Sequence, residues 1–237
     1  MTVSVVIPTL NERGNIEPLV AALENALSGI DWEAVFVDDN SSDGTAGAIE
    51  EIGRNNPRVH CLKRPGRLGL SSACMDGIGA SQGTYAAVMD ADLQHDPAAL
   101  NEMLDILRTQ EVDIAIGSRY VQGGSVHGWP KLRLGMSYVA TFWAQIVLGF
   151  QVKDPLSGFF MVRRSFFETV KAKLSTEGSK ILMDIVLSSE GAVIKEIPIC
   201  FKPRFKGHSK HNWRLVWQNC TIAIDKKLRR ISSRFEY

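Results

Sequence analysis

Over its first 118 residues the chain alternates short apolar runs with longer helical patterns, and this alternation constrains the fold more than any other feature. Five runs have the length and composition of strands, and four patterns between them place apolar residues at helical spacing. The strand-like runs are 3–7, 34–37, 59–62, 85–89 and 114–116, and the helical patterns are 16–27, 45–52, 70–78 and 97–107. Such alternation predicts an α/β fold in which helices cover a mostly parallel sheet.

Short polar side chains near the starts of three helical patterns are predicted N-caps. They are Asn15, Thr45 and Asp96, and Pro97 then occupies a first-turn position where its missing N–H is harmless. These residues support the same order of helices and strands.

The composition is close to that of an average soluble globular protein, with 45% apolar and 22% charged residues in 237. It excludes disorder, a collagen-like repeat and a small disulfide scaffold, and we expect one domain. The four cysteines form no C-x-x-C pair and have no zinc-ligand spacing, so we expect them to be reduced. Met1 leads directly into a strand-like run, so we expect no signal peptide and a cytosolic location.

Charge is distributed unevenly, although the formal net charge is only +1. Residues 1–201 carry a net charge of −7, whereas residues 202–237 carry +8. The basic segment suggests a site or surface that meets the phosphate groups of a nucleotide, a lipid headgroup or a nucleic acid. A solvated charged tail is the alternative interpretation.

Polar clusters follow four of the five predicted strands, at the edge of a parallel sheet where ligands bind. They are 8–12 (PTLNE), 38–45 (DDNSSDGT), 90–92 (DAD) and 117–119 (GSR). Three of the four contain carboxylates, which suit a metal ion and a nucleoside better than bare phosphate. The chain has no G-x-G-x-x-G after the first strand, no Walker A segment and no G-x-S-x-G, which weighs against dinucleotide oxidoreductases, P-loop NTPases and serine hydrolases.

Asp90 and Asp92 close an apolar strand, and alternation along a strand places both on one side, with Gln94 continuing the spacing. Two carboxylates and an amide oxygen suit Mg²⁺ or Mn²⁺, which would complete its coordination with diphosphate oxygens and water. The alternative is that these are polar residues at a helix start.

A charge-free stretch, 134–152, just meets the length of a membrane span. Ser137, Thr141 and Gln145 recur every four residues in it and give it a polar stripe. We therefore predict an amphipathic interfacial helix at about 131–150, lying on a membrane surface, with a buried core helix and a true span as alternatives.

Three segments together resemble family 2 glycosyltransferases, which have the GT-A (Rossmann-like) fold. They are 5–12 (VVIPTLNE), 37–45 (VDDNSSDGT) and 90–97 (DADLQHDP). Four later segments are similar to those of dolichyl- or polyprenyl-phosphate mannosyltransferases: 64–73 (RPGRLGLSSA), 117–120 (GSRY), 154–159 (DPLSGF) and 204–210 (RFKGHSK). The resemblance runs from about residue 3 to residue 210.

The resemblance implies a role for each matching residue. The nucleoside positions are Pro8, Glu12, Val37 and Asp39, and the metal ligands are Asp90, Asp92 and Gln94. The acceptor-phosphate residues are Arg119, Arg133 and Ser137. The basic residues around the donor diphosphate are Arg204 and Lys210. Asp90 also belongs to the donor site, and Asp92, Arg119 and Arg133 are the expected catalytic residues. Leu10 and Asn40 depart from the family pattern, so both guanine and uracil nucleotides stay open as donors.

The function implied is metal-dependent, inverting transfer of a hexose to dolichyl or polyprenyl phosphate at the cytoplasmic face of a membrane. Mannose from GDP-mannose is favoured, glucose from UDP-glucose is the alternative, and a non-catalytic sugar-nucleotide-binding scaffold is a rival of another class. A hydroxyl acceptor would require a general base, for which Asp154 is a candidate.

We expect a catalytic domain over 1–210 and a basic amphipathic segment over 211–237. The latter is expected to dock on anionic lipid or on a membrane-anchoring subunit. Nucleic acid is not an expected partner, because the basic residues lack aromatic platforms for stacking.

Overall fold

The computed structural model describes residues 1–149, 152–175, 180–189 and 191–206. Its strands are β1 Val3–Thr9, β2 Trp32–Asp38, β3 Val59–Lys63, β4 Tyr85–Val88, β5 Ile114–Ser118, β6 Ser125–Val126, β7 Phe160–Arg163, β8 Ile194–Pro198 and β9 Cys200–Phe201. Its α-helices are α1 Arg13–Ala26, α2 Thr45–Asn55, α3 Leu70–Ala80, α4 Ala99–Thr109, α5 Lys131–Leu148, α6 Arg164–Val170 and α7 Ile181–Ser188, with a 3-10 turn at Lys171–Lys173.

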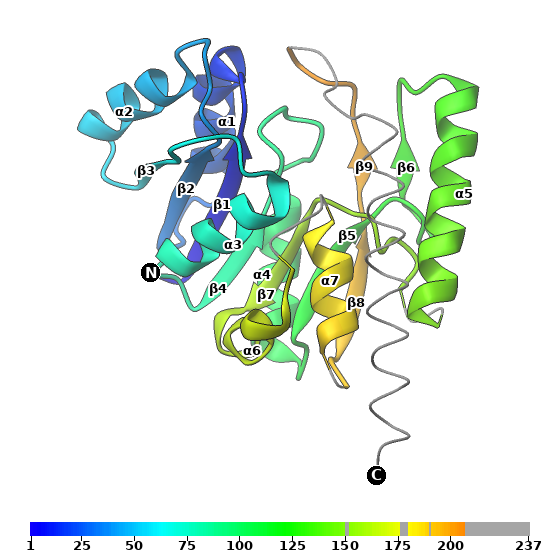
Figure 1. Ribbon diagram of the computed structural model, residues 1–237. Helices are drawn as coiled ribbons and strands as arrows, with labels where there is room; N and C mark the ends of the chain where they lie inside the picture. Colours follow the sequence, from blue (N-terminus) through cyan, green and yellow to red (C-terminus); the bar gives the residue numbers. More distant parts are fainter. Residues whose placement is uncertain (150–151, 176–179, 190, 207–237) are drawn as a thin grey trace.

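Seven strands form one sheet in the order β3-β2-β1-β4-β7-β5-β8, and β6 and β9 form a separate two-stranded sheet (Figure 1). β1 pairs in parallel with β2 and β4, β2 with β3, and β5 with β8, whereas β7 is antiparallel to both of its neighbours, β4 and β5. The predicted mostly parallel sheet is therefore confirmed. The inserted antiparallel strand β7 lies beyond the region in which the sequence pattern alternates.

Each face of the sheet is covered by helices, and the side chains of β1 show how the residues are divided between the faces. Val5 and Ile7 belong to the apolar cluster that includes α1 and α4, whereas Val6 belongs to the cluster that includes α3 and α7. Successive side chains of a strand point to opposite faces, so a strand that is covered on both sides needs a continuous apolar run. This is the run that the sequence provides.

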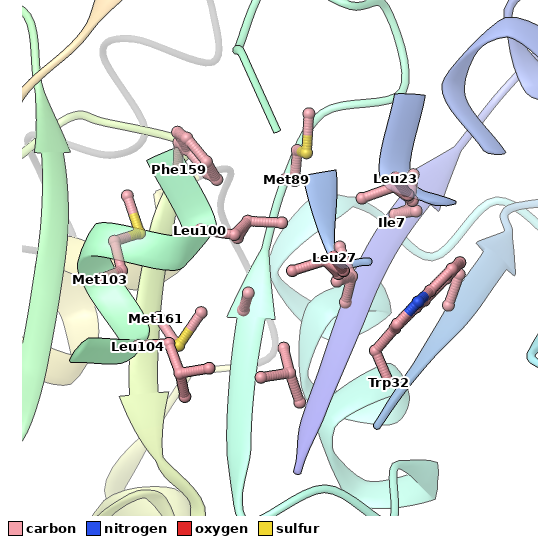
Figure 2. Close-up of a cluster of buried hydrophobic side chains, with 14 of the residues drawn as sticks. Ile7, Leu23, Leu27, Trp32, Met89, Leu100, Met103, Leu104, Phe159 and Met161 are labelled. Carbon is pink, nitrogen blue, oxygen red and sulfur yellow. The ribbon is translucent and has the colours of Figure 1, made fainter. Parts of the chain in front are cut away.

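Figure 2 shows part of the first cluster, where side chains from α1 and α4 lie over the sheet. Leu23 of α1 and Leu27, the C-cap of that helix, are fully buried beside Trp32, which begins β2. Met103 of α4 is also fully buried, and so is Phe159 just before β7. This packing fixes the sheet beneath the edge at which the polar clusters gather.

All three predicted N-caps are wrong. α1 begins at Arg13 with Glu12 as its N-cap, so Asn15 lies inside the helix. α2 begins at Thr45 itself, after Gly44 at φ 87°, and the Thr45 hydroxyl accepts a hydrogen bond from the Glu12 backbone N–H at 2.9 Å. Thr45 thus connects the first two polar clusters, and the Asn15 side chain donates to Glu12 and to the Lys206 oxygen, contacts that helix propensity cannot reveal. The third predicted N-cap is wrong as well: the N-cap of α4 is Ala98, and Asp96, two residues earlier, accepts a hydrogen bond from the Ala98 N–H at 3.1 Å.

Helix α5 lies within the range predicted for an interfacial helix, and its apolar face points outward. Its inner face carries Thr141, Ala144 and Leu148, all buried. The large apolar side chains exposed on it are Leu132, Tyr138, Val139, Phe142, Trp143 and Ile146, with exposed fractions from 36% to 77%. The predicted stripe of Ser137, Thr141 and Gln145 therefore lies towards the protein, opposite to the arrangement in an ordinary surface helix. Within the described part of the chain, no helix has both the length and the apolar character needed to cross a bilayer.

Close packing of α3 against β1 and β2 predicts that Gly77 tolerates no larger residue. A Cβ atom at this position would lie 2.3 Å from Val6 Cγ1 and 2.8 Å from Val37 Cγ2, and both valines are fully buried. We expect Gly77→Ala to lower the free energy of unfolding by about 1–3 kcal/mol, as overpacked cores do. Urea denaturation followed by circular dichroism measures this change.

Gly47 provides the matched control, because it is exposed in α2 and a Cβ there would meet no atom within 4 Å. Gly47→Ala should raise the free energy of unfolding by roughly 0.5–1 kcal/mol through helix propensity alone. Equal stability of the Gly77→Ala variant and the wild type would contradict the close approach of α3 to the sheet.

Candidate active site

The polar clusters predicted from the sequence meet at one edge of the sheet. β1, β2, β4 and β5 run in the same direction, so their carboxyl ends lie together. The residues that follow them include Glu12, Asp39, Asp92 and Arg119, and the first three are buried. The segment that follows β9 also reaches this edge.

Arg204 joins the first and the third of these clusters. Its Nη2 lies 2.8 Å from Asp92 Oδ2, and its Nη1 lies 3.4 Å from Glu12 Oε1. Glu12 also accepts a hydrogen bond at Oε2 from the Asn15 side chain, at 2.6 Å. A guanidinium is thereby held between two carboxylates that are 80 positions apart in the sequence. The structure thus brings together Glu12, Asp92 and Arg204, as the sequence predicts.

The backbone around Arg204 runs alongside the predicted metal loop. The Lys202 N–H donates to the Gln94 backbone oxygen at 2.9 Å, and the Phe205 N–H donates to the Asp92 backbone oxygen at 3.1 Å. The Gln94 amide Nε2 donates in turn to the Lys202 oxygen, at 2.9 Å. Gln94 therefore holds this segment with its nitrogen, while no described residue donates to its Oε1, which is the atom a metal would use.

Asp90 and Asp92 are two carboxylates close together in a dry environment. Burial raises the pKa of Asp92 to about 6, and the neighbouring Asp90 adds to the rise while Arg204 opposes it. Burial also raises the pKa of Asp90, against the charges of Lys180 and Arg204. Asp90 forms no hydrogen bond or ion pair within the described ranges, so its oxygens are available to a ligand. A divalent cation would relieve the unfavourable burial of both charges.

The donor set fits a metal that is shared with a substrate. Among the residues that the structure describes, no group of three or more His, Cys, Asp or Glu side chains is placed to hold a metal ion. Mg²⁺ in proteins commonly uses one or two carboxylates and completes its shell with substrate phosphates and water. Asp90 and Asp92, with the free oxygen of Gln94, match that pattern.

Leu93, which lies between Asp92 and Gln94 in the predicted metal loop, has a backbone φ of 59°. Left-handed backbone is unfavourable for a residue such as leucine, and it usually persists where the surroundings impose it. The Leu93 side chain packs against the core cluster, and the Gln94 N–H donates to Asp92 Oδ1 at 3.1 Å. The loop is therefore held in a strained turn whose polar side chains stay at the sheet edge.

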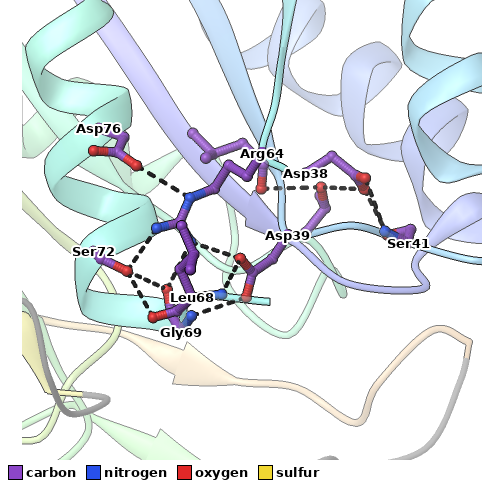
Figure 3. A network of polar contacts seen from close by, with 10 residues as sticks. Asp38, Asp39, Ser41, Arg64, Leu68, Gly69, Ser72 and Asp76 are labelled. Atoms are coloured by element: carbon purple, nitrogen blue, oxygen red, sulfur yellow. Dashed lines mark hydrogen bonds and ion pairs between the residues drawn. The ribbon is translucent and has the colours of Figure 1, made fainter. Parts of the chain in front are cut away.

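Asp39 fastens the loop that follows β3, as Figure 3 shows. Its Oδ1 accepts hydrogen bonds from Arg64 Nη1 at 2.6 Å and from the Leu68 N–H at 2.9 Å, and its Oδ2 accepts one from the Gly69 N–H at 3.0 Å. Arg64 is itself buried and also contacts Asp76, at 3.1 Å. Asp39 is thus at the expected edge, and its contacts order the loop beside the predicted nucleoside positions.

Pro8 and Val37 are neighbours in the β1–β2 register, at the end of the strands where a nucleoside is expected. The Val37 side chain points towards α3, because it would contact a Cβ atom at Gly77. Only the main chain of Val37 is therefore left to face a ligand at the edge. Thr9 donates from its hydroxyl to the Val37 oxygen at 3.3 Å.

Arg119 is fixed by Asp154 in a two-pronged ion pair. Its Nε donates to Asp154 Oδ2 and its Nη2 donates to Oδ1, both at 2.7 Å, and its backbone N–H donates to Oδ2 at 3.0 Å. Burial lowers the pKa of Arg119, but the hydrogen bonds that it donates to Asp154 and the nearby negative charges, that of Asp154 first, together outweigh burial, so the net shift of the pKa is upward. Asp154 is completely buried and both its oxygens are occupied, which makes it unsuited to the role of general base.

The other two residues expected at the acceptor phosphate lie on α5. Ser137 is joined to the end of β5 by a 2.8 Å hydrogen bond between its hydroxyl and that of Tyr120. Arg133 forms no ion pair within the described ranges, and its guanidinium carbon lies 4.1 Å from the centre of the Trp129 ring. Burial lowers the pKa of Arg133, and the charges of Arg204 and Arg119 lower it further. Three arginines therefore face one another across this edge.

Two functional candidates escaped the sequence analysis. Arg64 belongs to one of the segments that carry the family resemblance, but a lone arginine after a strand gives no sign of its contact with Asp39. Lys180 is a partly buried lysine directly before α7, and its Nζ donates to the Leu156 oxygen at 3.1 Å. Burial lowers the pKa of Lys180, and Asp90 and Asp154 partly restore it. The only signal for Lys180 in the sequence is a charge directly before the apolar run ILM.

Lys210, predicted at the donor diphosphate, and the predicted basic segment 211–237 lie outside the described residues. The predicted division of the chain at residue 210 stays a prediction for the same reason. The roles assigned to the other site residues also stay predictions, although the structure places these residues around one edge.

The chain belongs to glycosyl transferase family 2, whose family model matches residues 4–171. The chain is therefore a glycosyltransferase, which confirms the expected class of enzyme.

Relatives within this class agree with the narrower resemblance. The chain is 40% identical over 220 residues to a dolichol-phosphate mannosyltransferase of Pyrococcus furiosus, and the match covers 92% of this chain and 61% of that protein. It is 35% identical over 213 residues to a polyprenol monophosphomannose synthase of Mycolicibacterium smegmatis, covering 87% of this chain and 79% of the relative. The chain thus spans about three fifths of the length of the first relative.

A solved structure agrees with the fold. Glucosyl-3-phosphoglycerate synthase from Mycobacterium tuberculosis, in complex with Mn²⁺, uridine diphosphate and glucosyl-3-phosphoglycerate, has a TM-score of 0.71 over 97% of this chain and 79% of that chain. Its sequence identity is 18%, so the likeness concerns the fold alone. The GT-A fold expected from the sequence is confirmed.

His95, next to the metal loop, predicts a specific pH dependence of stability. It is buried and stacks on Phe159 with ring centres 4.9 Å apart, and burial lowers its pKa to about 4. In the unfolded chain the pKa of histidine is about 6.5, so the folded state favours the neutral ring. The resulting stability is present above pH 6.5 and is lost as the pH falls towards 4, by on the order of 3 kcal/mol.

We expect His95→Phe to remove this loss, because phenylalanine keeps the stacked ring and has no proton to gain. The measurement is urea denaturation of both proteins from pH 7.5 to pH 4.5, in a chelator so that no metal contributes. The difference in unfolding free energy between variant and wild type should move in favour of the variant as the pH falls. A difference that stays constant with pH would show that His95 gains no proton on unfolding.

Proposed function

We propose that this glycosyltransferase moves mannose from GDP-mannose to the phosphate of a dolichol or another polyprenol, with inversion at the sugar. The observation that carries the proposal is the meeting of Arg119, Arg133 and Arg204 at an edge whose described carboxylates are committed to other partners or to a metal. Such a concentration of guanidinium groups suits two phosphate-bearing substrates. The relatives named dolichol-phosphate mannosyltransferase and polyprenol monophosphomannose synthase support the choice of sugar and acceptor.

On the donor side, Glu12 and Asp39 are proposed to hold the nucleoside and Arg204 to hold the diphosphate. Transfer breaks the bond between the anomeric carbon and a diphosphate oxygen, so negative charge grows on that oxygen. A positive group held in place in a dry cleft stabilises this charge without reorganisation. Arg204, whose Nη2 lies 2.8 Å from Asp92 Oδ2, is close enough to the predicted metal loop to reach a diphosphate bound there.

Asp90, Asp92 and Gln94 are proposed to hold Mg²⁺ or Mn²⁺. The metal would supply further charge stabilisation for the leaving diphosphate. The two carboxylates would position it, and because their pKa values are raised, protons would compete with the metal as the pH falls.

On the acceptor side, no general base is required. The second pKa of a phosphate monoester is about 6, so at neutral pH the acceptor already carries an oxygen able to attack the anomeric carbon. Asp154, the one candidate base from the sequence, is instead bound to Arg119 by three hydrogen bonds. A soluble acceptor with a sugar hydroxyl would lack this advantage.

We further propose that α5 lies on the cytoplasmic face of a membrane, where the lipid chain of the acceptor is found. Its outward face is lined by Val139, Phe142 and Trp143, and Lys131 and Arg133 stand at its N-terminal end. Apolar side chains below and cations at the headgroup level are the features of an interfacial helix. This places Arg133 at the depth of a lipid phosphate. Segment 211–237 would add basic contacts with lipid or with a membrane subunit.

A donor screen tests the function. The protein is incubated with Mg²⁺, a short polyprenyl phosphate and each of GDP-mannose, UDP-glucose and other sugar nucleotides, and products are read by mass. We expect mannosyl phosphoprenol from GDP-mannose. Product from UDP-glucose alone would select the glucosyltransferase alternative, and binding of nucleotide without product from any donor would select the scaffold.

The metal assignment gives the next prediction. Asp92→Ala should lower turnover by more than the 10²- to 10³-fold that loss of a single electrostatic contact commonly causes, because it removes a metal ligand. Circular dichroism should show an intact fold. Full activity of this variant, or of the wild type in excess chelator, would contradict the assignment.

The acceptor assignment predicts a division between the two substrates. Arg133→Ala should reduce kcat/KM for the lipid phosphate by about 10²-fold, which is a typical loss for a charge-assisted phosphate contact, and should leave the Kd for GDP within about 2-fold. Calorimetry with GDP and a titration of acceptor measure the two values. Lys131→Ala, on the same helix and exposed, is the control for general loss of charge. Equal losses of GDP affinity and of acceptor use in Arg133→Ala would show that the site map is wrong.

A further inference from the structure

Trp129 stands at the junction between the two-stranded sheet and α5, two residues before that helix begins. Its place is set by β6, which pairs with β9 so that Val126 lies opposite Phe201. Gly128 then turns the chain at φ 74°, and a Cβ atom there would lie 2.9 Å from Pro203 Cγ. Only glycine fits this turn, and the turn delivers Trp129 against Phe201, with ring centres 5.4 Å apart at 76°.

The indole ring lies next to two of the three arginines. The guanidinium carbon of Arg133 is 4.1 Å from its centre, and that of Arg119 is 5.7 Å away. Arg119 has Asp154 as a partner, but the face of Trp129 is the only partner recorded for Arg133 in the described part of the chain. A tryptophan face is the strongest aromatic partner for a cation, and the attraction grows when water is excluded. The ring therefore holds a guanidinium that Arg119 and Arg204 repel.

The same ring is connected to the metal loop through a column of aromatic contacts. Phe201 meets His95 edge to face, with ring centres 5.1 Å apart, and His95 stacks on Phe159 at 4.9 Å. His95 follows Gln94 directly in the sequence. Phe159 and Phe201 are buried, so the column Phe159–His95–Phe201–Trp129 has a firm base in the core. It links the proposed metal ligands to the guanidinium at its far end.

We propose that Trp129 is a positioning residue for the acceptor: its indole face holds the Arg133 guanidinium at a set distance from Arg119 and from the metal loop. The inference rests on the proposed function, because it takes the acceptor phosphate to be bound by Arg119 and Arg133. Two like charges that are fixed before the substrate arrives need no rearrangement when a phosphate enters between them. The attacking oxygen of the phosphate is then aligned as soon as it binds, which lowers the barrier to transfer.

The indole N–H of Trp129 supports this role. It is buried and has no hydrogen-bond partner in the described ranges. A tryptophan kept for its hydrogen bond would show a partner for this group. The fold therefore uses the ring faces and edge of Trp129, which is what holding Arg133 requires. Phenylalanine should consequently replace it in part.

The test is a double-mutant cycle measured with a short, water-soluble polyprenyl phosphate, so that membrane docking does not contribute. The variants are Trp129→Leu, Trp129→Phe, Arg133→Ala and the double variant Trp129→Leu with Arg133→Ala. We expect Trp129→Leu to lower kcat/KM for the acceptor by about 3- to 30-fold, the range of a partly buried cation–aromatic contact. Trp129→Phe should recover part of the loss, and the Kd for GDP should stay within about 2-fold in every variant.

The double variant carries the decisive comparison. If Trp129 acts through Arg133, kcat/KM for the acceptor in the double variant should be no more than about 2-fold lower than in Arg133→Ala alone. Removing the indole cannot misplace a guanidinium that is already absent. Losses that multiply, or a Trp129→Leu variant with wild-type acceptor kinetics beside an impaired Arg133→Ala, would overturn the inference and leave the proposed function standing. Wild-type acceptor kinetics in Arg133→Ala would instead overturn the proposed function, and this inference with it.

Discussion

The active edge of this protein depends on one electrostatic constraint: Asp90 and Asp92 are two carboxylates held close together where water is scarce. Burial disfavours both charges, and each makes the other less favourable, so positive groups must be near. Arg204 supplies one of them through its 2.8 Å contact with Asp92. Lys202 and Phe205, on either side of Arg204, donate backbone hydrogen bonds to Gln94 and Asp92 of the metal loop. The end of the described chain is therefore held at the site by these bonds together with the ion pair between Arg204 and Asp92.

A second arrangement follows from the first, because the positive groups needed by the carboxylates repel one another. Asp154 neutralises Arg119, and an aromatic face holds Arg133. Cations that are restrained in these ways remain available to phosphate, whereas cations paired with free carboxylates at the surface would not be. Under the proposed function, these cations serve anions at two places, on either side of the proposed metal ligands. This division corresponds to a donor and an acceptor that both carry phosphate.

The sequence predicts much of this arrangement and misses the rest for physical reasons. Periodicity located β1 to β5 but not β8, which is also parallel to β5. The order of the first five strands implied that Glu12, Asp92 and Arg119 would meet at one edge. It did not reveal β7, since a strand that inserts antiparallel between β4 and β5 is defined by pairing with distant residues and not by its own pattern. Arg64 and Trp129 were missed as site residues for a similar reason. Arg64 acts through the carboxylate of Asp39, and Trp129 is placed by the ring of Phe201; both partners are far away in the sequence. Neither Arg64 nor Trp129 stands in a spacing typical of catalysis.

Few polar contacts join α5 to the strands that carry the carboxylates. β6 and β9 are two residues each, and the described polar links from α5 to the end of β5 include one hydrogen bond between hydroxyl groups, Tyr120 to Ser137. The helix is also held by apolar packing, through Ala144 and Leu148. In evolution, packing of this kind lets the helix that is proposed to face the acceptor diverge in chemistry while the proposed nucleotide and metal residues stay unchanged.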